Sequence, residues 1–356
     1  MNATNMDIDS INMNITAKNT SIMNTNVANV NVTTDMNATN INNTEIFHPH
    51  NMPAGLKMCH MIIEVILAII TVIPNGVVLL SYVKSTALQA ERYILLMSLS
   101  FCDFLVGLLA LPVSTVYHFI PINYDYINER YLCTARTFIV VVLLGVSIFH
   151  LAVISLLRFV TIQWPMQHAR FLTSFTLKVI AVIMWIYAIF LNHFMFFDKF
   201  NTWMPDTGSC LIYNIVVPGY FKIIQWHVIL FMIVCLISSI MIGYIAWKQS
   251  KKIAQVIVLS DANKEKLKTE KKYTKTLLLI VGLFLITFLP FSIFSSFRFD
   301  IDSVWLQSFG LFISMFGFCN SAMNPWVYAL RHQTFRHAML RTLKCSGTKT
   351  SVTSAS

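Results

Sequence analysis

The sequence predicts an all-α membrane protein, a seven-transmembrane helix bundle followed by a short amphipathic helix on the inner membrane surface. Hydrophobic residues make up 56% of the 356 residues and charged residues only 12%, whereas soluble domains are about 25% charged. The apolar residues fall into seven continuous runs, each with the roughly 20 residues that a helix needs to cross a bilayer. The net charge of +10 comes from Lys and Arg between and after these runs, a pattern typical of membrane proteins rather than of nucleic-acid binding.

Residues 1–52 form a polar tail before the first run. This tail is rich in Asn, Thr and Met and has no periodicity, so we expect it to be disordered. It lacks the features of a cleavable signal peptide, so the first apolar run is expected to direct membrane insertion. Six N-x-S/T sequons lie in the tail, although an Asn- and Thr-rich tract also makes such sequons by chance. The glycosylation candidates are Asn2, Asn14, Asn19, Asn31, Asn37 and Asn42.

Seven runs account for the expected transmembrane domain, residues 53–329. They lie at about 58–83, 91–117, 131–163, 173–196, 219–249, 271–297 and 303–329. With the N-terminus outside, 19 of the 26 Lys and Arg residues fall in inner segments and 7 in outer ones. This asymmetry predicts a multi-pass membrane protein with its N-terminus outside and its C-terminus in the cytoplasm.

Residues 330–344 are too short to cross the membrane. Phe335, Met339 and Leu343 recur every four residues among Arg and His, which predicts an amphipathic helix that contacts lipid of the inner leaflet. A Ser/Thr-rich cytoplasmic tail, 345–356, follows. Cys345 lies just after this helix and is a candidate for palmitoylation; the alternative is an unmodified cysteine.

Acidic side chains inside the apolar runs are few, chiefly Glu64 and Asp103. A carboxylate at such a depth is costly and marks a functional site by default. A channel or transporter needs a longer polar pathway, and a transporter built on inverted repeats would repeat a span. A membrane enzyme needs a Ser/His, di-Asp or metal constellation at one depth. The sequence offers none of these, so we expect neither a transporter nor an enzyme.

The seventh run carries the most specific motif, NSAMNPWVY at 320–328. Pro325 frees a backbone carbonyl and kinks the helix, while Asn324 and Tyr328 need polar partners inside the bundle. The segment resembles the N-S-x-x-N-P-x-x-Y motif of rhodopsin-family (class A) G-protein-coupled receptors. The resemblance extends over about 58–345 and includes Asn75, Trp185 and a phenylalanine, Phe335, that opens the surface helix.

The resemblance implies a plasma-membrane receptor that passes an extracellular signal to a heterotrimeric G protein by an outward swing of helix six about Pro290. The Ser/Thr cluster from Ser346 to Ser356 is a candidate site for a receptor kinase and arrestin; the alternative is that this tail is simply disordered. Phe288 and Thr287 stand where the family has tryptophan and cysteine. The residues that match the coupling and switch positions are Arg158, Tyr244, Glu270, Phe284, Phe288, Pro290, Asn324, Pro325 and Tyr328.

One departure concerns the residue beside the family's arginine. Leu157 precedes Arg158 where the family has an acid, so Glu270 is the remaining restraint expected on that arginine. Leu236 also replaces the usual proline of helix five. These departures leave three outcomes open: an ordinary receptor, a constitutively active orphan receptor, or a decoy that does not couple.

The resemblance also implies a disulfide and an ion site. Family members join the residues matching Cys133 and Cys210 by a disulfide on the oxidising outer face. They hold sodium at an aspartate in helix two, matched here by Asp103, with oxygen-bearing partners suited to a hard cation. Those partners are Ser147, Asn320, Ser321 and Asn324. The alternative is a protonated aspartate in a hydrogen-bond network; no other cofactor is expected.

The ligand is constrained by the matching pocket positions. Val140 replaces the aspartate that binds amines, and Phe318 replaces both the lysine that binds retinal and the histidine that partners Glu64 in adenosine receptors. The expected pocket is apolar: Val140, Val141, Leu144, Val228, Met232, Phe288 and Phe291. Arg136, Lys222 and Arg298 at its rim either grip a carboxylate or phosphate or extend to lipid headgroups. A peptide or lipid-like ligand is expected, not an amine.

Overall fold

The computed structural model describes residues 53–119, 126–164, 172–202, 212–255, 261–296, 304–331 and 333–345. All of them belong to one compact unit, Glu45–Ser356. Side chains are described for most of these residues but not for 251–277.

Long helices occupy the seven expected runs. The first is α2 (Ala54–Lys84), and the second consists of α3 (Ile94–Leu105) and α4 (Leu111–Phe119), joined by the π-helical turn η4 (Val106–Ala110). Then follow α5 (Tyr126–Gln163), α7 (Ser174–Asn192) with the 3-10 turn η5 (His193–Phe196), α9 (Pro218–Gln255), α10 (Asp261–Ser296) and α11 (Val304–Arg331). Shorter elements are η2 (Thr86–Leu88), η3 (Glu91–Tyr93), α8 (Ile212–Ile215) and α12 (Gln333–Cys345).

Some helices are longer than the apolar runs that predicted them, because polar residues continue the helix beyond the run. α9 reaches Gln255 and α10 begins at Asp261, beyond the apolar limits at 249 and 271. Hydropathy marks the part of a helix that suits lipid, whereas Lys, Glu and Gln are good helix formers that prolong it into water. At α7, Thr173 caps the N-terminus: its side chain accepts a 3.2 Å hydrogen bond from the backbone N–H of Thr176, as N-cap residues do.

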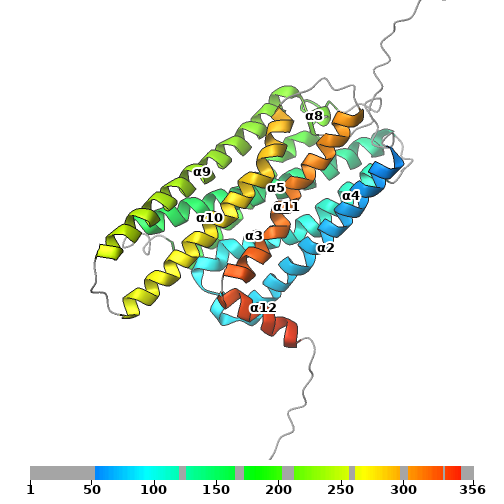
Figure 1. The fold of residues 1–356 in the computed structure, drawn as a ribbon. Coiled ribbons are helices and arrows are strands. Elements are labelled where there is room, and N and C mark those ends of the chain that lie inside the picture. Colours follow the sequence, from blue (N-terminus) through cyan, green and yellow to red (C-terminus); the bar gives the residue numbers. More distant parts are fainter. Residues whose placement is uncertain are drawn as a thin grey trace, which may run out of the picture. The chain divides into compact units, whose positions relative to one another are not determined.

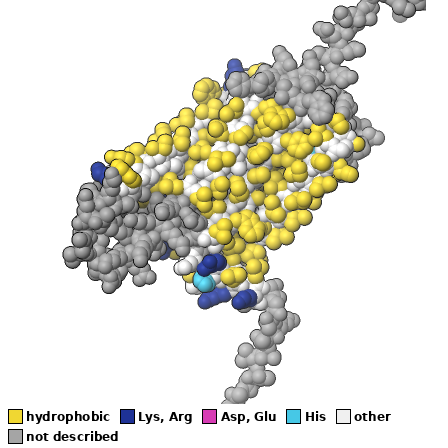
Figure 2. All heavy atoms as spheres, in the orientation of Figure 1, with side chains coloured by type: hydrophobic (Ala, Val, Ile, Leu, Met, Phe, Trp, Pro, Cys, Tyr) yellow, Lys and Arg dark blue, Asp and Glu magenta, His cyan; other side chains and the backbone are white. Residues whose placement is uncertain are grey.

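Apolar side chains cover most of the described surface on the face of the bundle shown in Figure 2. Ile66, Ile183 and Trp226 are between 53% and 68% exposed, an arrangement stable in lipid and unfavourable in water. Within the described residues, five stretches are long and apolar enough to cross a membrane: Ala54–Lys84, Glu91–Val116, Arg130–Gln163, Ser174–Phe196 and Pro218–Ile245. In α10 the segment Val281–Ser296 is a shorter apolar helix.

α5 contacts α3, α7 and α9, while α10 contacts α9 and α11, and α11 packs on α2 and α3 (Figure 1). α12 packs on α2 and α11 at one end of this bundle, which we term the α12 end. The opposite end, where α2, α9 and α11 begin, is termed the cavity end. Successive long helices therefore run in opposite directions.

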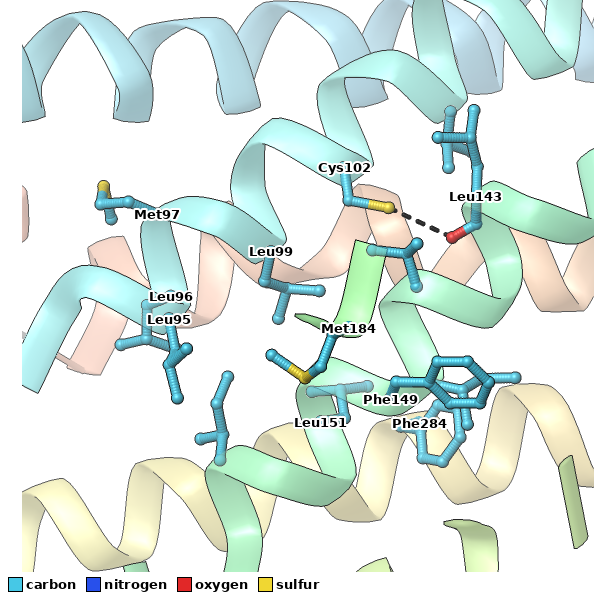
Figure 3. Packing of buried hydrophobic residues seen from close by; sticks show 14 of the residues in the cluster. Leu95, Leu96, Met97, Leu99, Cys102, Leu143, Phe149, Leu151, Met184 and Phe284 are labelled. Carbon is cyan, nitrogen blue, oxygen red and sulfur yellow. Dashed lines mark hydrogen bonds between the residues drawn. The ribbon is translucent and has the colours of Figure 1, made fainter. Parts of the chain in front are cut away.

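Buried apolar side chains join the helices at mid-bundle (Figure 3). Cys102 of α3 donates a 3.1 Å hydrogen bond from Sγ to the carbonyl oxygen of Leu143 in α5. Phe149 of α5 lies beside Phe284 of α10 in the same cluster. The core therefore spans helices that are far apart in the sequence.

α12 divides its apolar side chains between the bundle and the outside. Phe335 is fully buried, with its ring centroid 5.3 Å from that of Tyr328, and Thr342 accepts a 3.0 Å hydrogen bond from the hydroxyl of Ser81 in α2. Leu343, expected on the same stripe as Phe335, is 55% exposed. The residues of the expected stripe therefore do not all face the same way. The side of α12 that packs on the bundle consists of Phe335, Ala338 and Thr342, whereas Leu343 faces outward.

Candidate ligand cavity and polar centre

A cavity of about 170 Å³ lies between α5, α9, α10 and α11 at the cavity end. Six of the seven apolar residues expected at the pocket line it: Val140, Val141, Leu144, Val228, Phe288 and Phe291. Met232 does not, because it lies one helical turn deeper than Val228 and is buried in the core. Of the three expected cations, Arg136 lines the cavity, Lys222 is exposed, and Arg298 lies outside the described residues.

Polar side chains on α9 and α10 form part of the wall that the sequence analysis missed. The side-chain amide of Gln225 donates to the carbonyl oxygen of Ser292 and to the hydroxyl of Ser295, both at 3.1 Å, and to that of Ser296 at 2.7 Å. These bonds tie the two helices together beside the cavity. A signal was present in the sequence, because Ser292, Ser295 and Ser296 stand on one helical face at spacings of three and four.

Arg136 belongs to a buried polar cluster next to the cavity. Its Nη2 donates a 2.9 Å hydrogen bond to Oγ of Ser114 in α4. The neighbouring Thr115 donates from Oγ1 to Oε2 of Glu64 in α2 at 2.7 Å. Glu64 Oε2 lies 3.7 Å from Nδ1 of His60, and both side chains are almost wholly buried.

The sequence singled out Glu64 and Arg136 separately but not the residues that connect them. Ser114 and Thr115 lie in the second span, next to Arg136 of α5 and Glu64 of α2. A single sequence does not show that these three helices meet at this point. His60 precedes Glu64 by four residues, a spacing that places both on one face of α2.

The polar centre lies deeper, around Asp103, which is fully buried. Nδ2 of Asn324 in α11 donates a 2.7 Å hydrogen bond to Asp103 Oδ2. Asn320 donates a 3.3 Å bond to the hydroxyl of Ser147 in α5, and the hydroxyls of Ser147 and Ser321 face the carboxyl group. The five residues expected at the ion site therefore lie together.

Some buried oxygen atoms of the polar centre make no hydrogen bond within the described residues. Oδ1 of Asp103 and Oγ of Ser321 are buried and make no hydrogen bond within the described part of the chain. Buried acceptors of this kind need a partner, and a carboxylate with neighbouring hydroxyl and amide oxygens fits a hard cation.

Aromatic rings connect the cavity to the core. Phe288 lines the cavity and stacks on Phe284, with ring centroids 5.6 Å apart and planes 24° apart. Phe291 meets Phe288 edge-on at 5.6 Å. Because Phe284 is fully buried, movement of Phe288 changes the packing of the core.

The other expected switch residues are spread from the level of the cavity, at Pro290, toward the α12 end. Pro290 and Pro325 both lie inside helices, and Tyr328 is fully buried. Tyr244 is 55% exposed, with its ring 6.2 Å from that of Trp247, so the structure does not bring it to the buried switch residues. Leu157 packs against the core, and the partly buried Arg158 follows it near the end of α5.

Several expected sites lie outside the described residues. Cys133 forms a disulfide, but Cys210, its expected partner, is outside, so the pairing stays a prediction. The backbones of Glu270 and Cys345 belong to α10 and α12, but their side chains are not described. Residues 1–52 and 346–356 are also outside, together with the six candidate glycosylation sites Asn2, Asn14, Asn19, Asn31, Asn37 and Asn42.

Comparison with known proteins agrees with the seven-helix fold. Residues 74–328 match the model of a protein family described as 7 transmembrane receptor (rhodopsin family). Trace amine-associated receptor 5 of Homo sapiens is 31% identical over 278 residues, 74% of this chain and 77% of that protein. The Histamine H2 receptor of Cavia porcellus is 26% identical, covering 81% and 80%. Adenosine receptor A2a of Equus caballus is 24% identical, covering 82% and 74%.

Proposed function

Because the chain belongs to the rhodopsin family of seven-transmembrane receptors, we propose that it binds a small lipid-like ligand in the cavity and passes this signal to heterotrimeric G proteins. It is a G-protein-coupled receptor rather than an enzyme. The main support for the proposal is that Phe288 both lines the cavity and stacks on the buried Phe284.

The size and lining of the cavity support a small apolar ligand. A volume of about 170 Å³ resembles the roughly 150 Å³ cavity that binds benzene in another protein, which favours a small molecule over a peptide. Six phenylalanines are in the wall: Phe149, Phe221, Phe288, Phe291, Phe294 and Phe318. Such a wall favours an aromatic or branched apolar group.

An amine is the second candidate, because relatives are named as receptors for trace amines and histamine. The described lining residues include no Asp or Glu, and they include the cation Arg136. Val140 stands at the position where aminergic receptors have the aspartate that binds the ammonium group. An ammonium group would therefore enter a cavity with a positive wall, which disfavours amines.

For the activating motion we propose an outward swing of α10 about Pro290. A ligand that displaces Phe288 shifts its contact with Phe284 and so biases a packed core between two arrangements. Asp103, Ser147, Asn320, Ser321 and Asn324 would hold sodium and stabilise the arrangement that keeps their oxygens together. The cavity end would then face outward and the α12 end the cytoplasm of a plasma-membrane receptor, where a receptor kinase and arrestin would follow the G protein.

Nucleotide exchange tests the receptor function directly. Full-length protein in lipid nanodiscs should accelerate exchange on at least one Gα class from a panel. Arg158→Ala should abolish this effect, whereas Lys178→Ala, which removes an exposed cation from α7, should leave it unchanged. If wild type leaves exchange on every Gα at the rate of empty nanodiscs, with or without ligand, the protein is a decoy.

A further inference from the structure

The described wall of the cavity has a positive charge, Arg136, that a buried side chain holds in place. Arg136 is the one Lys or Arg among the described residues that line the cavity. Its guanidinium donates a hydrogen bond to the hydroxyl of Ser114, a residue that is only 3% exposed. A guanidinium has five N–H donors in a fixed fork, so Arg136 can bind Ser114 and other protein groups and still donate to a ligand anion.

Glu64 belongs to the same polar cluster but does not line the cavity. It is 2% exposed. It accepts the hydroxyl of Thr115, and the Ser114 hydroxyl also faces it. Ser114 thus connects the cation of the wall to a buried carboxylate, which restrains the direction of the guanidinium.

We propose that Arg136 is the anion subsite of the cavity, and that the ligand is a small aromatic or branched carboxylic acid. Its carboxylate would lie against the Arg136 guanidinium, and its apolar body would lie among the phenylalanines toward Phe288. This inference rests on the proposed function, because it assigns the chemistry of the ligand for that same cavity.

Two properties of the site favour an acid over a neutral or basic ligand. Hydrogen bonds between ionised partners are about twice as strong as neutral ones, and the apolar wall weakens solvent screening. An amine of the same shape would meet the cation Arg136 in the wall and no Asp or Glu among the described lining residues, so the charges would repel. Arg136 would thus determine specificity, since the cation lines the cavity and the carboxylate of Glu64 does not.

Direct binding to full-length protein in nanodiscs tests this without any G protein. The probes are 3-phenylpropanoic acid, its amide and 3-phenylpropan-1-amine, which share a body and differ in charge. Wild type should bind the acid about tenfold or more tightly than the amide, and the amine most weakly. Arg136→Gln should remove the preference for the acid while leaving the affinity for the amide unchanged. Arg136→Lys should retain part of it, because an ammonium lacks the planar fork.

The matched control is Arg130→Gln, which removes a cation from the start of α5 that pairs with Asp198 at 2.7 Å. This variant should bind all three probes like wild type. Equal affinities of wild type for acid and amide, tightest binding of the amine, or no binding of any probe would overturn the subsite. Selective acid binding without accelerated nucleotide exchange would instead uphold the subsite and contradict the proposed function.

Discussion

Asn324 of α11 donates a 2.7 Å hydrogen bond to the carboxylate of Asp103 in α3, joining two helices that are more than two hundred positions apart in the sequence. This bond uses one carboxylate oxygen and leaves Oδ1 without a partner in the described residues. The arrangement supplies both the helix contact and the oxygen atoms of the proposed ion site.

Replacing Asp103 by asparagine should abolish any dependence of basal signalling on sodium. In wild type, sodium should lower basal activity, because an ion stabilises whichever conformation keeps its ligands together. Basal reporter activity would be compared after exchange of sodium for N-methylglucamine. Equal sodium sensitivity in wild type and Asp103→Asn would contradict the ion site and favour a protonated aspartate.

Cys210→Ser should reduce surface expression and thermal stability, because loss of a native extracellular disulfide typically costs about 2–5 kcal/mol. The expected partner, Cys133, is disulfide-bonded. Cys59→Ser is the matched control, since Cys59 is a free, exposed thiol. A Cys210→Ser protein that reaches the surface and melts like wild type would rule out the pairing.

Gly107→Ala should destabilise the bundle, because α2 and η4 approach each other at this glycine. An added Cβ would lie 2.7 Å from Cγ2 of Val72 and 3.0 Å from its backbone nitrogen. Overpacking of this kind typically costs about 1–3 kcal/mol. Gly243→Ala, where nothing lies within 4 Å, should be neutral or slightly stabilising. Melting temperatures of the purified variants decide the matter, and a Gly107→Ala protein as stable as Gly243→Ala would refute the close approach.

Leu157→Asp should lower basal signalling, and Glu270→Ala should raise it. The reason is that Leu157 packs on the core and offers no acid to restrain Arg158, so Glu270 is the expected remaining restraint. A restraint of about 1.4 kcal/mol changes the active population roughly tenfold. The measurement is basal G-protein reporter activity at matched surface expression. A wild-type signal at the level of mock-transfected cells, unmoved by either change, would favour the decoy reading.

Cys345 should carry a palmitoyl group. It ends α12, close to the basic residues Arg341 and Lys344, where a lipid anchor would reinforce the contact of this helix with the membrane. Hydroxylamine-dependent acyl exchange should label wild type and the Cys59→Ser control, but not Cys345→Ser. Equal labelling of wild type and Cys345→Ser would show that the cysteine is unmodified.

The sequence by itself determined the fold class and much of the polar centre. Lipid demands long apolar helices with satisfied backbones, and this demand is visible in every run of the chain. Asp103 and Asn324 were also identifiable, because a polar side chain is rare and costly at such a depth. The family motifs then predicted that these residues meet, and the hydrogen bond between them agrees.

Only the tertiary structure decided how the helices turn toward one another. Apolar residues occur on every face of a span in lipid, so hydropathy cannot tell which apolar face lines a cavity and which meets lipid. Met232 was assigned to the cavity and is buried below it, whereas Gln225 was overlooked and joins α9 to α10. The contact of Arg136 with Ser114 likewise depends on the rotation and depth of separate helices. The rotation and depth of each helix are set by packing contacts between residues distant in sequence. The residues of one span alone do not determine them.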